Sequence, residues 1–183
     1  MSSPLAIVAL VGRLVVLFSL LMLVPLCASW LDGGRALHAF SWSLVATLAS
    51  GIAMVALTRG HLGELRPRDG FVMVGVIWFL LPTFAAVPLL LAIPGLSVTD
   101  AFFEAMSGFT ATGATVLVGL DHLPIAVNVW RCLLNLVGGL GIVVLAVAVL
   151  PMLGVGGSQL FRTEITGPMK DQKLTPRISD TAR

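Results

Sequence analysis

Long runs of apolar residues, separated by short polar connections, dominate the chain. Four of these runs are long enough to cross a bilayer as α-helices, which requires about 20 predominantly apolar residues. We expect the spans at residues 5–30, 39–57, 71–93 and 125–153. The pattern therefore predicts an all-α membrane protein.

The first span contains two residues that interrupt its apolar pattern. Arg13 lies in its first third, and the span is long enough for this side chain to reach the near face of the membrane. Pro25 predicts a bend near the far end because it removes a helical hydrogen bond. The run is too long for the core of a signal peptide, so we expect it to remain as a transmembrane helix.

A shorter helical run, residues 99–109, lies between the last two spans. Ser97 or Thr99 can cap its first turn, and Asp100 suits the positive end of the helix dipole. Eleven residues give about 16 Å of helix, which is only about half the hydrocarbon thickness. We therefore predict a re-entrant half-helix that enters the bilayer and stops.

The residues after this half-helix read TATGAT, from Thr110 to Thr115. An irregular turn at membrane depth is tolerated only where it lines a wet, protein-walled cavity. Extended backbone can present successive carbonyl oxygens to a cation, and Gly113 permits a conformation that a side chain would forbid. The C-terminal end of the half-helix adds about half a negative charge. The alternative is an ordinary packed loop, but the half-length helix favours an ion pore.

Glu104 lies within the half-helix and has two interpretations. It could attract cations, as could Asp100, or it could pair structurally with a basic group such as Arg131. The glycines Gly138, Gly139 and Gly141 in the last span allow close packing or a bend.

Composition supports a membrane protein. The chain of 183 residues is 57% hydrophobic and 11% charged, with a mean hydropathy of +1.02. The net charge of +2 does not indicate a nucleic-acid partner, because the basic residues lie in loops rather than in a stripe with aromatic residues. Cys27 and Cys132 each lie in an apolar stretch, where we expect buried small side chains rather than a disulfide or a zinc site.

Basic residues are distributed asymmetrically about the predicted spans. The excess falls on one side, which places both termini in the cytoplasm and the re-entrant loop outside. Trp130 and Arg131 then form an interfacial pair at the outer start of the last span. The residues on the cytoplasmic side are Arg13, Arg59, Arg66, Arg68, Arg162, Lys170, Lys173, Arg177 and Arg183, against Arg35 and Arg131 on the other.

Catalytic chemistry has little support in the sequence. No paired carboxylates, activated nucleophile or metal cluster occurs at a usable spacing, and Asp121 with His122 is at best a weak acid–base pair at the outer mouth. His38 and His61 each lack a second ligand nearby. We therefore expect a protein that is not an enzyme.

Three stretches carry a resemblance to a known family. They read SVTDAFFEAMSGFTATGAT, LPIAVNVWRCLLNLVGGLGIVVLAVAVLPMLGVGGSQLFRTE and KLTPRISDTAR. They resemble the first part of Trk-type potassium transporters, the TrkH and KtrB group, from about Leu65 to the end of the chain. The first two spans match mainly by hydropathy. The resemblance implies a potassium-channel-like fold in which four repeats of helix, pore loop and helix surround one pore, with two leading helices in the TrkH type.

The resemblance also implies an ion site. Thr110, Ala111, Thr112, Gly113 and Ala114 would form the first of four filter segments, binding potassium through backbone carbonyl oxygens. Gly113 stands at the family's filter-glycine position, where glycine rather than serine suits a potassium-selective member.

The organisation implied by the resemblance has three parts. Residues 1–63 are the two leading helices, 64–153 the first helix, pore-loop, helix repeat, and 154–183 a cytoplasmic linker toward a second repeat. One repeat cannot close a four-fold pore, so we expect an N-terminal piece of a longer transporter in preference to an assembly of several copies.

The implied function is potassium uptake across the bacterial inner membrane. The implied partners are membrane lipid, the further repeats of the transporter, a second copy in a homodimer and a cytosolic nucleotide-binding regulatory subunit of the TrkA type. The alternative from another class is a non-conducting membrane scaffold with a packed re-entrant loop.

Overall fold

A computed structural model describes residues 4–59 and 67–152 of the chain. All regular elements in this part are helical. The predicted linker at 154–183 lies outside the described residues, as do His61 and Arg66. The chain divides into two compact units, Met1–Leu145 and Ala146–Arg183.

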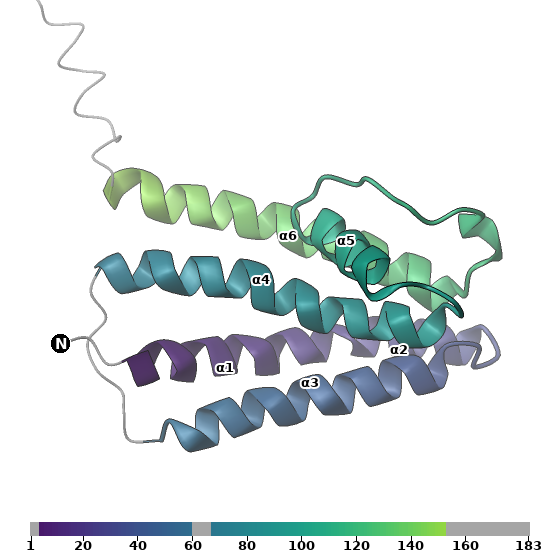
Figure 1. Cartoon of the computed structure of the whole chain (residues 1–183), viewed down its shortest axis with the longest axis horizontal. Helices are drawn as coiled ribbons and strands as arrows, with labels where there is room; N and C mark the ends of the chain where they lie inside the picture. The colour runs from purple at the N-terminus through teal and green to yellow at the C-terminus, as the bar shows by residue number, and fades with distance from the viewer. Residues whose placement is uncertain (1–3, 60–66, 153–183) are drawn as a thin grey trace, which may run out of the picture. The chain divides into compact units, whose positions relative to one another are not determined.

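Within residues 4–59 and 67–152, four helical stretches are long and apolar enough to cross a membrane, as the sequence predicted. They are Pro4–Leu31, Leu37–Leu57, Asp69–Ala92 and Ile125–Leu145. Figure 1 shows α1 (Pro4–Leu21), α3 (Leu37–Leu57) and α4 (Pro67–Ala92) running side by side. The short α5 (Val98–Phe109) packs against α4 and also contacts α6 (Ile125–Met152).

The first span is a helix broken in two, α1 (Pro4–Leu21) and α2 (Leu23–Leu31). The break falls at Met22 because Pro25 has no N–H to donate to the carbonyl of Leu21. The N–H of Met22 donates instead to the carbonyl of Ser19, at 3.0 Å, in a tighter turn. The predicted bend is therefore present, one turn before the proline.

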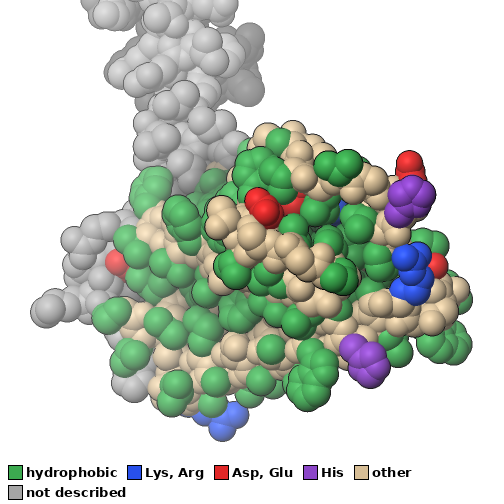
Figure 2. All heavy atoms as spheres, turned by 45° about the vertical axis from the view of Figure 1, so that its right-hand side comes forward, with side chains coloured by type: hydrophobic (Ala, Val, Ile, Leu, Met, Phe, Trp, Pro, Cys, Tyr) green, Lys and Arg blue, Asp and Glu red, His purple; other side chains and the backbone are tan. Residues whose placement is uncertain are grey.

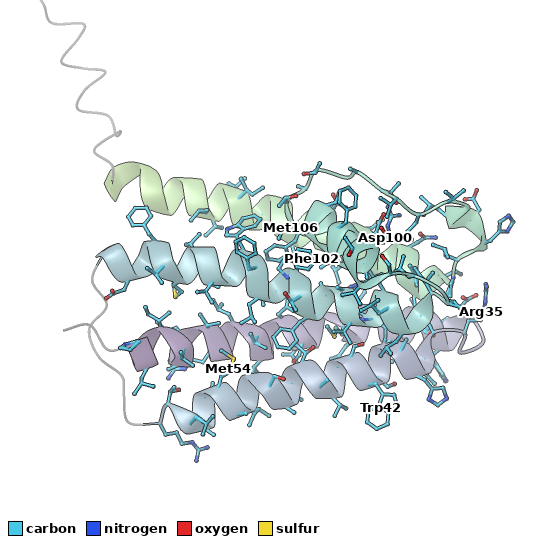
Figure 3. All side chains as sticks on the ribbon, in the orientation of Figure 1. Arg35, Trp42, Met54, Asp100, Phe102 and Met106 are labelled. Atoms are coloured by element: carbon cyan, nitrogen blue, oxygen red, sulfur yellow. The ribbon has the colours of Figure 1, made fainter. Side chains whose placement is uncertain are left out.

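Two glycines bring α1 and α3 (Leu37–Leu57) into close contact. A Cβ placed on Gly12 would lie 2.8 Å from Cβ of Met54, and one on Gly51 would lie 2.8 Å from Cγ2 of Val16. Met54 is seen between the two helices in Figure 3. Small residues permit such close approach between membrane helices, where packing rather than water exclusion drives association.

Trp130, near the start of α6 (Ile125–Met152), lies in the hydrophobic core. Its indole packs against Phe18 and Phe40, with ring centroids at 5.7 and 6.1 Å. Its Nε1–H donates to the carbonyl of Ala85 at 3.0 Å. That carbonyl lies in α4 (Pro67–Ala92), three residues before Pro88, which lies inside the helix.

The expected interfacial position of Trp130 is therefore wrong. The side chain is 0% exposed, because α1, α3 and α4 pack around it. A tryptophan followed by an arginine at the start of a span resembles a membrane-interface pair. Only the tertiary packing of α1, α3 and α4 around it reveals a core residue.

The expected burial of the two cysteines is also wrong. Cys27 and Cys132 are both exposed on the surface of the chain. Each lies on the side of its helix that faces away from the described core, where apolar residues remain uncovered. Figure 2 shows hydrophobic side chains over much of one face, with few charged side chains among them. Such a surface suits lipid or further protein rather than water.

Candidate functional site

The predicted half-helix is present as α5 (Val98–Phe109). Its 12 residues extend about 18 Å, too short to span the hydrocarbon core of a bilayer. Ser97 caps it, since its Oγ accepts a hydrogen bond from the N–H of Asp100 at 3.0 Å. The same hydroxyl donates to the Asp100 carboxylate at 2.7 Å. Both groups therefore fix where the helix begins.

The far end of α5 reaches the middle of α6. A Cβ added to Gly138 would overlap the carbonyl group of Phe109, and one added to Gly108 would lie 3.0 Å from Cβ of Leu134. Gly138 lies 13 residues after Ile125, the first residue of α6, which corresponds to about 20 Å along the helix. The half-helix therefore ends beside the middle of the last apolar span rather than beside its start.

A tight turn follows α5 and depends on one carbonyl. The oxygen of Ser107 accepts the N–H of Thr112 at 2.9 Å and that of Gly113 at 3.4 Å. Gly113 has φ +72°, the left-handed conformation that its predicted role requires. Ala111 also has a positive φ, of 55°. A non-glycine residue here is strained by about 1–2 kcal/mol, and the sequence contains no signal for it.

Four consecutive carbonyl oxygens in this turn are left without a protein donor. Within the described part of the chain, the carbonyls of residues 110–113 accept no hydrogen bond. Residues 111–113 are exposed in this chain, so these oxygens are open to another ligand. The threonine hydroxyls are engaged locally: Thr110 Oγ1 donates to the carbonyl of Met106 at 2.9 Å and lies 2.8 Å from Thr112 Oγ1.

Ala114 differs from the other four predicted filter residues. Its carbonyl accepts the hydroxyl of Ser107 at 2.6 Å. A carbonyl oxygen has two lone pairs, so one remains available. The hydrogen bond fixes the direction in which the chain leaves the turn.

Glu104 holds the segment that follows. It is 3% exposed, and its Oε1 accepts the hydroxyl of Thr115 at 2.5 Å, the N–H of Val116 at 2.6 Å and the N–H of Leu117 at 3.3 Å. Its Oε2 lies 3.0 Å from Nε of Arg131 on α6. Of the two interpretations of Glu104, the structural pairing with Arg131 is confirmed. The backbone contacts to residues 116 and 117 could not be read from the sequence.

The residues at the end of this segment, just before α6, contact the turn between α2 and α3. The carboxylate of Asp32 accepts the N–H of Ile125 at 3.1 Å, and Arg35 donates from Nη2 to the carbonyl of His122 at 3.1 Å. Figure 3 shows Arg35 at this end of the helices. Asp121 and His122 are exposed there, within the short 3-10 helix Leu120–His122.

An apolar hollow of about 390 Å³ lies beside the turn. It is lined by aromatic and methionine side chains of α5, including Phe102 and Met106, together with Thr110, Thr112 and Ala114. Three of the five predicted filter residues thus border a face that this chain leaves uncovered. No cluster of three His, Cys, Asp or Glu side chains suited to a metal occurs in residues 4–59 and 67–152.

These features define a class of protein: an all-helical membrane protein with a re-entrant half-helix, in the manner of potassium channels. Residues 37–183 match the TrkH family, described as cation transport proteins. The chain belongs to this family.

Two similar proteins and a solved structure support the assignment to this family. The Trk system potassium uptake protein TrkH of Escherichia coli strain K12 is 47% identical over 179 residues, covering 97% of this chain and 37% of the relative. TrkG of the same strain is 43% identical over 94% of this chain and 36% of the relative. The crystal structure of the potassium transporter TrkH from Vibrio parahaemolyticus superposes with a TM-score of 0.78 at 42% identity, covering 97% of this chain and 35% of that one. The chain thus spans little more than a third of these relatives.

Proposed function

We propose that this chain forms the first of four walls of a potassium-conducting pore in a Trk-type uptake protein. The observation that carries the proposal is the run of unpartnered carbonyls at residues 110–113, placed at the inner end of a half-helix. The names of the relatives, which are potassium uptake proteins, support potassium as the transported ion.

The proposed ion site is made by backbone oxygen, from Thr110, Ala111, Thr112 and Gly113, with Ala114 contributing its second lone pair. Carbonyl dipoles replace the water shell of a dehydrated cation. The C-terminal end of α5 adds a partial negative charge of about half a unit at the same place. Potassium is here the cargo rather than a resident cofactor, and the protein performs transport rather than catalysis.

The three-part organisation at 1–63, 64–153 and 154–183 belongs to the same proposal. The repeats that would complete the pore cover the hollow beside α5, whose lining is apolar and includes filter residues. A homodimer and a cytosolic nucleotide-binding subunit of the TrkA type are the further proposed partners. We place the protein in the bacterial inner membrane with both termini in the cytoplasm, from the distribution of basic residues.

Two glycines provide a matched test of the filter. Gly113 and Gly119 both have a left-handed φ, of 72° and 70°. A Cβ at Gly113 would lie 3.9 Å from Asn135 Oδ1, and one at Gly119 would lie 3.6 Å from Cδ2 of His122, so neither is blocked by its neighbours. Alanine therefore strains the backbone about equally at both, by about 1–2 kcal/mol.

The measurement is potassium and rubidium uptake by a transport-deficient bacterial strain that expresses the complete reading frame containing this chain. Gly113→Ala should lower potassium uptake or its preference over sodium at least tenfold, whereas Gly119→Ala should leave both near wild type. Unchanged uptake and selectivity after both Gly113→Ala and Gly113→Asp would refute the filter and favour the non-conducting scaffold. Equal loss from both alanine variants would assign the effect to general strain.

A further inference from the structure

A second hollow lies between the two leading helices, away from the filter. It has a volume of about 500 Å³ and is lined by residues of α1 and α3. Two of them are arginines, Arg13 and Arg59, and the others are apolar: Val16, Leu17, Ile52 and Val55, with Ala56. The groove thus combines a cationic end with an apolar floor.

Both arginines have exposed side chains, and neither has an ion-pair partner in the part of the chain that the structure describes. Arg13 lies nine residues into α1, which is about 14 Å from its first residue. A positive charge at such a depth is costly unless it reaches the interface or meets an anion. Arg59 follows the end of α3 and lines the same groove.

We infer that this groove binds an anionic phospholipid. Its phosphate lies between Arg13 and Arg59, because guanidinium groups bind phosphate oxygens in a bidentate manner. One acyl chain lies along Val16, Leu17 and Ile52; Leu17 is 60% exposed and Ile52 is 53% exposed in the chain alone. The lipid's phosphate pairs with both guanidinium groups, offsetting one of their two charges, and its acyl chain covers apolar surface, a combination that neither free phosphate nor a neutral lipid offers.

The groove lies beside the close crossing of α1 and α3. Gly12 and Gly51 bring the two backbones together, and Arg13 and Ile52, the residues that follow them, both line the groove. The site does not depend on ion conduction. It remains whether or not the filter assignment holds.

The test measures which lipid stays bound. The complete reading frame that contains this chain is purified in micelles with equal amounts of phosphatidylglycerol and phosphatidylcholine, and native mass spectrometry counts the retained lipids. Each basic side chain near a membrane surface contributes roughly fivefold to binding of anionic lipid. Arg13→Gln with Arg59→Gln should therefore lower phosphatidylglycerol retention about thirtyfold relative to wild type.

Arg35→Gln is the matched control, because it removes a positive charge at the opposite end of α3. It should leave phosphatidylglycerol retention unchanged. Leu17→Trp keeps both charges and fills the apolar floor, so it should also lower retention. Circular dichroism reports whether each variant keeps its helices.

The following outcomes would overturn the inference. They are equal retention by the double variant and wild type, loss of retention in Arg35→Gln, no effect of Leu17→Trp, and displacement of phosphatidylglycerol by inorganic phosphate, which would indicate a free-anion site. A wild-type protein that carries no lipid here because a second copy covers the groove would overturn it as well.

Discussion

The carboxylate of Glu104 meets the guanidinium of Arg131 at 3.0 Å, and the same carboxylate accepts three donors from the segment that leaves the turn. One buried side chain therefore connects the half-helix, the candidate filter segment and the last helix. The side chain of Glu104 is 1% exposed and that of Arg131 is 18% exposed, so water cannot replace either partner fully.

Glu104→Gln should destabilise the protein by about 3 kcal/mol, because removing one partner of a buried pair leaves the other charge uncompensated. The measurement is the free energy of unfolding in mixed micelles. Asp121→Asn, a change of the same kind at an exposed carboxylate, is the control and should lie within about 0.5 kcal/mol of wild type. Equal effects of the two variants would contradict the role assigned to Glu104.

Gly138→Ala should destabilise the protein by about 1–3 kcal/mol or more, since the new Cβ would overlap the backbone carbonyl of Phe109. Gly141→Ala is the matched control in the same helix: its Cβ meets nothing within 4 Å, so the change should be neutral or stabilising by up to about 1 kcal/mol. Thermal unfolding of both variants checks the prediction. A neutral Gly138→Ala would mean that α5 and α6 do not touch at this depth.

Gly51→Ala should also destabilise the protein, by about 1–3 kcal/mol. Its Cβ would lie 2.9 Å from the backbone nitrogen of Val16 and 3.1 Å from the carbonyl oxygen of Gly12, and backbone atoms cannot move aside as a flexible side chain can. Gly75→Ala in α4 has open space around it and serves as the control in the same unfolding assay. If the two substitutions behave alike, the close crossing of α1 and α3 is not a source of stability.

Trp130→Phe should lower the free energy of unfolding by about 2 kcal/mol. It removes the hydrogen bond to the carbonyl of Ala85, worth about 1 kcal/mol, and leaves space in the core. Trp42→Phe makes the same chemical change at a side chain that is 67% exposed, visible at the surface of α3 in Figure 3, and should have little effect. Comparable losses from both would show that Trp130 contributes no more than a surface indole.

The spans and the half-helix could be predicted from the sequence because each depends on local information. Length, apolar content and the cap at Ser97 lie within one stretch of chain, and the structure places them as expected. The pairing of Glu104 with Arg131 was one of two alternatives, since opposite charges 27 residues apart can meet only if the helices pack.

Other features depend on tertiary contacts that no local pattern encodes. Trp130 is buried only because α1, α3 and α4 surround it. The left-handed conformation of Ala111 follows from the hydrogen bonds to Ser107 rather than from its own preference. The contact of Asp32 with Ile125 joins positions 93 residues apart, and neither residue is distinguished in its own stretch.

The bonds from Asp32 and Arg35 to the start of α6 have a consequence for biosynthesis. A chain emerges from the ribosome N-terminus first, so the turn that carries both side chains is complete long before Ile125 is added. Asp32 and Arg35, which bind the end of the loop, are therefore synthesised before the loop itself. When α6 is inserted, both side chains are already present to bind its start. The order of translation thus matches the order in which these contacts can form.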